Sequence, residues 1–353
     1  MDWDLAVRVA SRFARRGAFA AAPEDSNLEA DFQELTAQAE LLVARQTGLP
    51  SLAGPAKARV ADRVQWVEAN VASFQRLLRP LTERFEAKLE GRSGFAPVAR
   101  RAAGAEVGML LGWMSTRVLG QYDLLVLEDE RPDEQDIVYY VGPNIAALEA
   151  RFAFPSRQFR LWIALHECTH RAQFTGVPWL RPYFLSLVTD LLGSVEPDSQ
   201  RLREAVRQTI LDLRKGEKPL DRGGIAAMVA SPEQRAVIDR IGGLMSLLEG
   251  HGDVVMDRAG AALLPSADRF GRVLKARRQS AGGLTKLVQK LIGLDAKLAQ
   301  YAQGERFIAE VEKAGGPALF DRVWQGSAWL PTLEEIREPK QWIDRVQWSE
   351  AVV

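Results

Sequence analysis

Apolar side chains recur every three or four positions over most of this chain, which is the spacing of helices with one buried face. The run of Val60, Val64, Val67 and Val71 is the clearest example. The pattern predicts helices over 4–20, 27–47, 56–90, 97–120, 156–174, 181–194, 199–214 and 232–258, and further helix to about residue 314. Beyond that point a loop-rich segment with several tryptophans is expected.

Two short runs break the helical pattern. Tyr122–Leu127 and Asp136–Val141 are rich in β-branched, aromatic and leucine residues, with a polar connection over 128–134. They predict a small sheet just before the helix over 156–174. An exposed edge of such a sheet can bind an extended peptide through main-chain hydrogen bonds. The expected fold class is therefore mainly α with a small β-sheet (α+β).

Glycines mark places where helices are expected to approach closely. Gly104, Gly108 and Gly112 recur at four-residue intervals and predict one tightly packed helix face. Gly242 and Gly243 lie inside the predicted helix over 232–258, where glycine lowers helix stability. We expect another helix to approach at this pair, and the helix over 156–174 is the favoured partner.

Two regions are expected, a helical N-terminal region over 1–95 and a core over 96–353 with a helical C-terminal part, packed as one compact unit. The 353 residues are 47% hydrophobic, which is ordinary for a globular protein. Lys plus Arg equals Asp plus Glu at 46 each, so no charge excess favours nucleic acid or an anionic membrane.

Three further observations predict a cytoplasmic protein. No uncharged apolar stretch reaches the roughly 18 residues of a membrane span, and the N-terminus lacks the features of a secretory signal. Cys168 is the only cysteine, so the chain cannot form an intrachain disulfide, which fits a reducing compartment.

The sequence His166-Glu-Cys-Thr-His170 is a His-Glu-x-x-His motif inside a predicted helix. On a helix the two histidines are one turn apart and point to the same side. Such a pair can bind one zinc ion, and Glu167 can then act as general base on a zinc-bound water. The chain has only three histidines, so this spacing would seldom arise by chance. Burying these groups without a metal would leave polar atoms unpaired at high cost.

A third protein ligand must come from elsewhere in the chain, because a catalytic zinc keeps three of them. Glu249 is the leading candidate. Asp253 follows it by one helical turn and could accept the other ring N–H of a ligand histidine. His251 is the alternative third ligand. It lies about 200° around the helix from Glu249, so the two should not reach one metal together.

These motifs resemble the zincin-like metallopeptidase type 2 family of actinobacteria, some of whose members are labelled as associated with deazaflavin coenzyme biosynthesis. The resemblance lies in the His166–His170 motif with the following Arg171-Ala-Gln-Phe174, and in Glu249-Gly-His-Gly-Asp253. It extends to 294–301, 304–307 and 330–335. It implies a zincin-like core with extra helices, bound Zn²⁺ and peptidase activity. The Glu249-x-x-x-Asp253 pattern is similar to the gluzincin helix, in which Glu binds zinc and Asp supports a histidine.

The favoured function is therefore a gluzincin-type metallopeptidase that hydrolyses a peptide or protein substrate, with Glu167 as the catalytic base. Two alternatives stay open. One is a zinc amidohydrolase or esterase that acts on a small non-peptide substrate of cofactor metabolism. The other is a catalytically idle metal-binding protein that serves an interaction. A groove beside an edge strand would favour peptides, whereas a closed pocket would favour small molecules.

Overall fold

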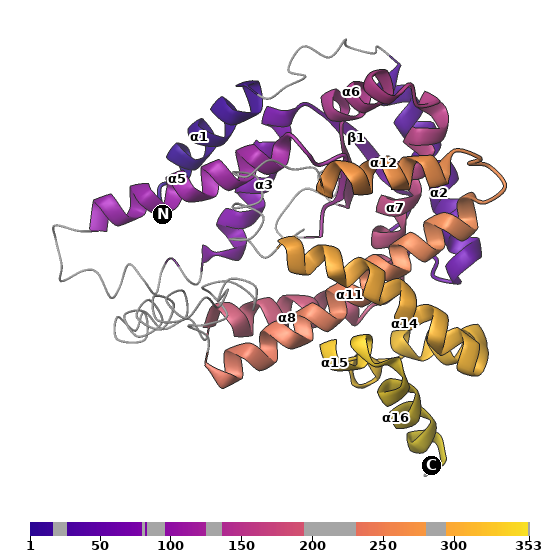
Figure 1. Ribbon diagram of the computed structural model, residues 1–353. Coiled ribbons are helices and arrows are strands. Elements are labelled where there is room, and N and C mark those ends of the chain that lie inside the picture. The colour runs from indigo at the N-terminus through magenta and orange to yellow at the C-terminus, as the bar shows by residue number, and fades with distance from the viewer. Residues whose placement is uncertain are drawn as a thin grey trace. The chain divides into compact units, whose positions relative to one another are not determined.

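The computed structural model describes residues 1–16, 27–79, 82, 96–124, 136–193, 231–279 and 294–351. Helices predominate in these ranges (Figure 1). The chain divides into two compact units: Met1–Gly176 with Val255–Phe270, and Val177–Val254 with Gly271–Val353. The boundary predicted between residues 95 and 96 falls at the end of a stretch outside the described residues, and it stays a prediction.

The first unit combines helices with a small sheet, as predicted. Its helices are α1 (Trp3–Arg16), α2 (Leu28–Thr47), α3 (Arg63–Leu77), α5 (Ala96–Ser115), α6 (Gly142–Phe152) and α7 (Ser156–Gly176). Its strands are β1 (Lys57–Ala61), β2 (Gly120–Tyr122) and β3 (Ile137–Val141). Two helices contribute to both units: α11 (Pro232–Gly260) and α12 (Ala267–Gln279).

The sheet has the strand order β1-β3-β2, with β1 parallel and β2 antiparallel to β3. The Asp123 N–H donates to the Ile137 carbonyl, so these two residues form a hydrogen-bonded pair. Hydrogen-bonded and non-hydrogen-bonded pairs alternate along an antiparallel ladder. The main-chain groups of Tyr122 and Gly120 therefore point away from β3. Among the described strands, β2 presents these groups along one edge of the sheet.

The predicted helix over 56–90 was wrong at its start, because Lys57–Ala61 is a strand. Pairing with β3 uses the main-chain groups of this segment, and nothing in the local apolar spacing reveals a partner that lies 80 residues away. The helix begins only after Asp62. The Asp62 carboxylate accepts hydrogen bonds from the main-chain N–H groups of Val64 and Gln65, in a capping box that starts the helix there.

The glycine-bearing face of α5 packs against α1, and the two helices lie side by side (Figure 1). A Cβ atom built on Gly108 would lie 2.6 Å from the carbonyl oxygen of Ala6. One built on Gly112 would lie 2.9 Å from the carbonyl oxygen of Ala10. The predicted close-packing face is therefore confirmed, and it serves the core of a helical pair.

Replacing Gly108 by alanine is expected to destabilise the protein by about 1–3 kcal/mol, because the added methyl group overlaps the α1 backbone. This loss outweighs the higher helix propensity of alanine. The matched control is Gly271→Ala in α12, where a Cβ meets nothing within 4 Å. That change should stabilise by about 0.4–1 kcal/mol. Urea unfolding of both variants measures the difference, and equal stability of the two would contradict the packing argument.

The described part of the second unit contains helices joined by short connections, and no strand. It contains α8 (Leu180–Gly193), most of α11, α14 (Leu294–Phe320), the 3₁₀ helices η3 (Asp321–Trp324) and η4 (Ser327–Trp329), α15 (Leu333–Arg337) and α16 (Pro339–Ala351). The loop-rich C-terminal segment predicted after residue 314 was therefore wrong. Trp342 is fully buried there, and its indole N–H donates to the carbonyl of Trp329. The predicted helix over 199–214 lies outside the described residues.

Other parts of the chain approach α11 closely at glycines within it, as expected. The segment that approaches Gly243 is Pro331–Leu333 and not the predicted helix over 156–174. A Cβ on Gly243 would meet the backbone of Pro331–Leu333 at 2.7–2.9 Å. Gly250 lies against Gly304 of α14, with 2.4 Å between a built Cβ and the Gly304 carbonyl carbon. None of the described helices is both long and apolar enough to cross a bilayer.

Candidate metal centre

The helix that carries the motif, α7, is packed along α2 and is almost entirely buried. Arg160 of α7 pairs with Asp31 of α2, and Arg171 pairs with Glu40 further along both helices. The contacts advance in the same order on each helix, so the two run in the same direction. This packing fixes α7 at several points along its length.

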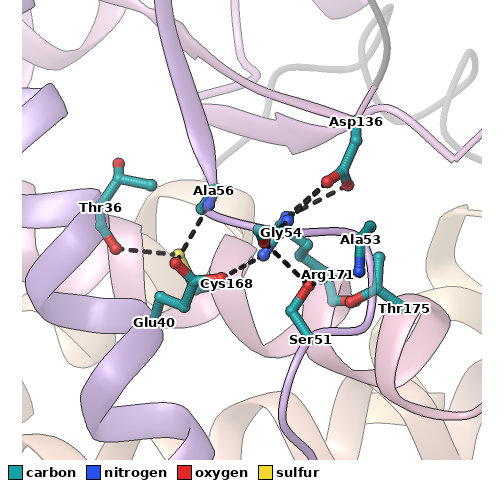
Figure 2. Close-up of polar contacts among 10 residues, drawn as sticks. All are labelled: Thr36, Glu40, Ser51, Ala53, Gly54, Ala56, Asp136, Cys168, Arg171 and Thr175. Atoms are coloured by element: carbon teal, nitrogen blue, oxygen red, sulfur yellow. Dashed lines mark hydrogen bonds and ion pairs between the residues drawn. The ribbon is translucent and has the colours of Figure 1, made fainter. Parts of the chain in front are cut away.

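Arg171 holds the motif-bearing end of α7 to three other segments (Figure 2). Its Nε donates to both carboxylate oxygens of Asp136 at 3.1 Å, and one terminal nitrogen pairs with Glu40. The other terminal nitrogen donates to the Gly54 carbonyl at 2.7 Å. The Arg171 side chain is only 2% exposed. The residue next to His170 therefore joins α7 to α2, to the loop before β1 and to the start of β3.

Replacing Arg171 by methionine is expected to destabilise the protein by about 3–5 kcal/mol, because Glu40 and Asp136 would lose a largely buried cationic partner. The matched control is Arg157→Met on the same helix, whose ion pair with Glu34 is solvent-exposed. That change should move the unfolding midpoint little. Guanidinium unfolding compares the two variants. Similar unfolding midpoints for both would show that the buried ion pairs of Arg171 contribute nothing to the stability of the fold.

The structure brings the two motif histidines together as predicted. The Nε2 atoms of His166 and His170 lie 3.2 Å apart, with the ring planes at 86°. Two nitrogens bound tetrahedrally to one zinc at its usual bond length are about 3.3 Å apart. Both histidines are half-buried. The pair therefore fits two ligands of a single zinc ion.

Glu167 turns from the histidines toward the edge of the sheet. Its Oε2 accepts a hydrogen bond from the main-chain N–H of Tyr122 at 3.1 Å. Gly120 provides the space, because a Cβ there would lie 2.6–2.8 Å from the Glu167 side chain. The carboxylate thus lies against β2, on the edge that faces away from β3.

The three remaining predicted residues, Glu249, His251 and Asp253, lie in the part of α11 that belongs to the second unit. Glu249 is 7% exposed and His251 is 5% exposed. The ring of His251 packs against Trp324 and Phe320, at centroid distances of 5.0 and 5.6 Å. Aromatic packing therefore accounts for the burial of His251.

Comparison with known proteins decides the family. The sequence profile described as zincin-like metallopeptidase matches residues 1–343. The chain belongs to the zincin-like metallopeptidase family. The family confirms the predicted resemblance and implies a metal, typically zinc. The actinobacterial origin and the link to deazaflavin coenzymes stay predictions.

A solved structure supports the same class of activity. The chain resembles a crystal structure of a candidate hydrolase with a novel fold from Chloroflexus aurantiacus, with 34% sequence identity and a TM-score of 0.72. The match covers 98% of this chain and 99% of that one. A search of curated proteins found no match. Together, the zincin-like family and this neighbour support a zinc-dependent hydrolase.

Sequence reasoning missed two features of the site. Gln173 lies beside His170, with its Oε1 atom 3.0 Å from the His170 Nδ1 atom. The i, i+3 spacing on one helix could have revealed this neighbour. The contacts of Gly120 and Tyr122 with Glu167 had no such local signal, since about 45 residues separate them.

Proposed function

We propose that this zincin-like protein is a zinc-dependent metallopeptidase. The observation that carries the proposal is the convergence of the His166 and His170 Nε2 atoms, with Glu167 between them in sequence and alongside β2. When bound, zinc would polarise the substrate carbonyl and lower the pKa of a water molecule. His166, His170 and Glu249 would hold the ion, and as a set they have the donor chemistry of a zinc site.

Each proposed ligand has a chemical argument. The two imidazoles are the ligands that the motif provides, and a glutamate as the third gives the ligand set of known catalytic zinc sites. His251 is the weaker alternative, because its ring is engaged by Trp324 and Phe320. Asp253 would accept a ring N–H from a ligand histidine and so fix that ring's orientation.

Glu167 would act as the general base. Its Oε2 is held by the Tyr122 N–H, which orients the carboxylate. Its other oxygen, Oε1, would take a proton from the attacking water and deliver it to the leaving amine. Because Glu167 is 7% exposed, little bulk water competes for that proton.

The position of β2 favours a peptide as the substrate. The main-chain groups of Gly120 and the carbonyl of Tyr122 point away from β3, beside the Glu167 carboxylate that the Tyr122 N–H binds. An extended peptide can pair with such groups by hydrogen bonds that do not depend on its side chains. We also propose a cytoplasmic location, which the single buried thiol favours.

The test is digestion of a mixed peptide pool by the full-length protein, followed by mass spectrometry. Cleavage should disappear after zinc is removed with a chelator and return when zinc is added back. Cleavage that survives chelation would contradict the proposal. Hydrolysis of small esters or amides, with none of the peptides cut, would support the amidohydrolase or esterase alternative.

A further inference from the structure

The segment that follows the motif, Arg171-Ala-Gln-Phe174, contains a polar side chain that the proposed reaction does not use. Gln173 is fully buried, at 0% exposure, on the motif helix. It is three residues after His170 and shares its helix face. Its Oε1 atom lies 3.0 Å from the Nδ1 atom of His170. A buried amide in this place constrains the ring that it touches.

The contact determines which nitrogen of His170 carries the hydrogen. A neutral imidazole has one N–H group and one lone pair. The amide oxygen can only accept, so the hydrogen must lie on Nδ1, which donates to Gln173. The lone pair is then on Nε2, and this atom faces the Nε2 atom of His166. That is the protonation pattern that a metal ligand needs.

We infer that Gln173 is a positioning residue that holds His170 in its metal-binding tautomer. This inference rests on the proposed zinc site. It assigns to Gln173 the orienting role that outer partners of ligand histidines play, whose loss typically weakens metal affinity 10–100-fold. An amide performs this role without adding a negative charge, so Gln173 orients the ring while leaving the charge of the site to the proposed ligand Glu249.

The affinity test compares four full-length proteins: wild type, Gln173→Leu, Gln173→Glu and Gln158→Leu. The last is the matched control, since it makes the same change on α7 about 22 Å along the helix. Zn²⁺ and Co²⁺ affinities are measured by competition with a coloured chelator. Gln173→Leu should bind about 10–100-fold more weakly, whereas Gln173→Glu, which still accepts from Nδ1–H, should restore binding. Equal affinities for Gln173→Leu and Gln158→Leu would overturn the inference.

A second measurement does not depend on metal or on any variant of Gln173. The chain has three histidines, so ring ¹⁵N spectra of the metal-free protein contain three spin systems, and His170→Gln assigns one of them. We expect the hydrogen of His170 on Nδ1, and a hydrogen on Nε2 would overturn the inference. If the wild type binds no metal, the proposed zinc site fails, and these spectra still show whether His170 carries its hydrogen on Nδ1, as the contact with Gln173 requires.

Discussion

Hydrolysis by the Glu167→Gln variant is expected to fall by about 10²–10⁴-fold, the usual contribution of a general base. Glutamine has the same shape and can still accept the Tyr122 N–H through its amide oxygen, so the site should keep its geometry. It cannot take up a proton at neutral pH. The zinc content of the variant should match that of the wild type, because Glu167 is not a proposed ligand.

The turnover number and the zinc content are measured on the same preparations. Glu68→Gln, at an exposed position of α3, is the matched control and should keep full activity. Full activity of Glu167→Gln would exclude it as the base. A normal zinc content without hydrolysis in either the wild type or the variant would support the idle, partner-binding alternative.

The second large effect concerns the third ligand. Glu249→Ala should lose zinc affinity by more than the roughly 100-fold that follows loss of an outer contact, because one of three direct bonds is removed. His251→Ala should lose packing against Trp324 and Phe320 and keep its zinc. Asp239→Ala, an exposed position earlier on α11, is the matched control.

Metal analysis of the three purified variants after dialysis against buffered zinc gives the answer. Full zinc occupancy in Glu249→Ala together with loss in His251→Ala would contradict our ligand assignment. Loss of zinc in both variants would show that the packing of His251 is needed to hold Glu249 in place for the metal.

Local spacing predicted most of what lies on single helices. The apolar period placed α2, α7 and α11 within a few residues of their observed ends, and the pairing of His166 with His170 follows from one helical turn. The helix boundaries and the histidine pairing depend on residues that are near one another in the sequence. The same reasoning could have paired Gln173 with His170.

Features that depend on distant segments were missed for a physical reason. Lys57–Ala61 becomes a strand because β3 offers a parallel partner, and apolar spacing records burial but not pairing. The bond between Glu167 and Tyr122 likewise joins two elements that meet only in the folded unit. In the C-terminal part, short helices are found where loops were expected. The helix that the Thr332 capping box starts has only five residues, which is too few for its apolar residues to show a helical spacing.

The single thiol of the chain has a practical consequence. Cys168 lies between Glu167 and His170 in sequence, is 3% exposed, and its Sγ contacts the Thr36 carbonyl of α2 at 3.6 Å. Burial raises the pKa of this thiol. An alkylating reagent can reach the thiol only when α7 separates from α2. Because each molecule has one thiol, the labelling rate measures how often that separation occurs. Wild-type protein thus carries its own reporter of how firmly the motif helix is seated.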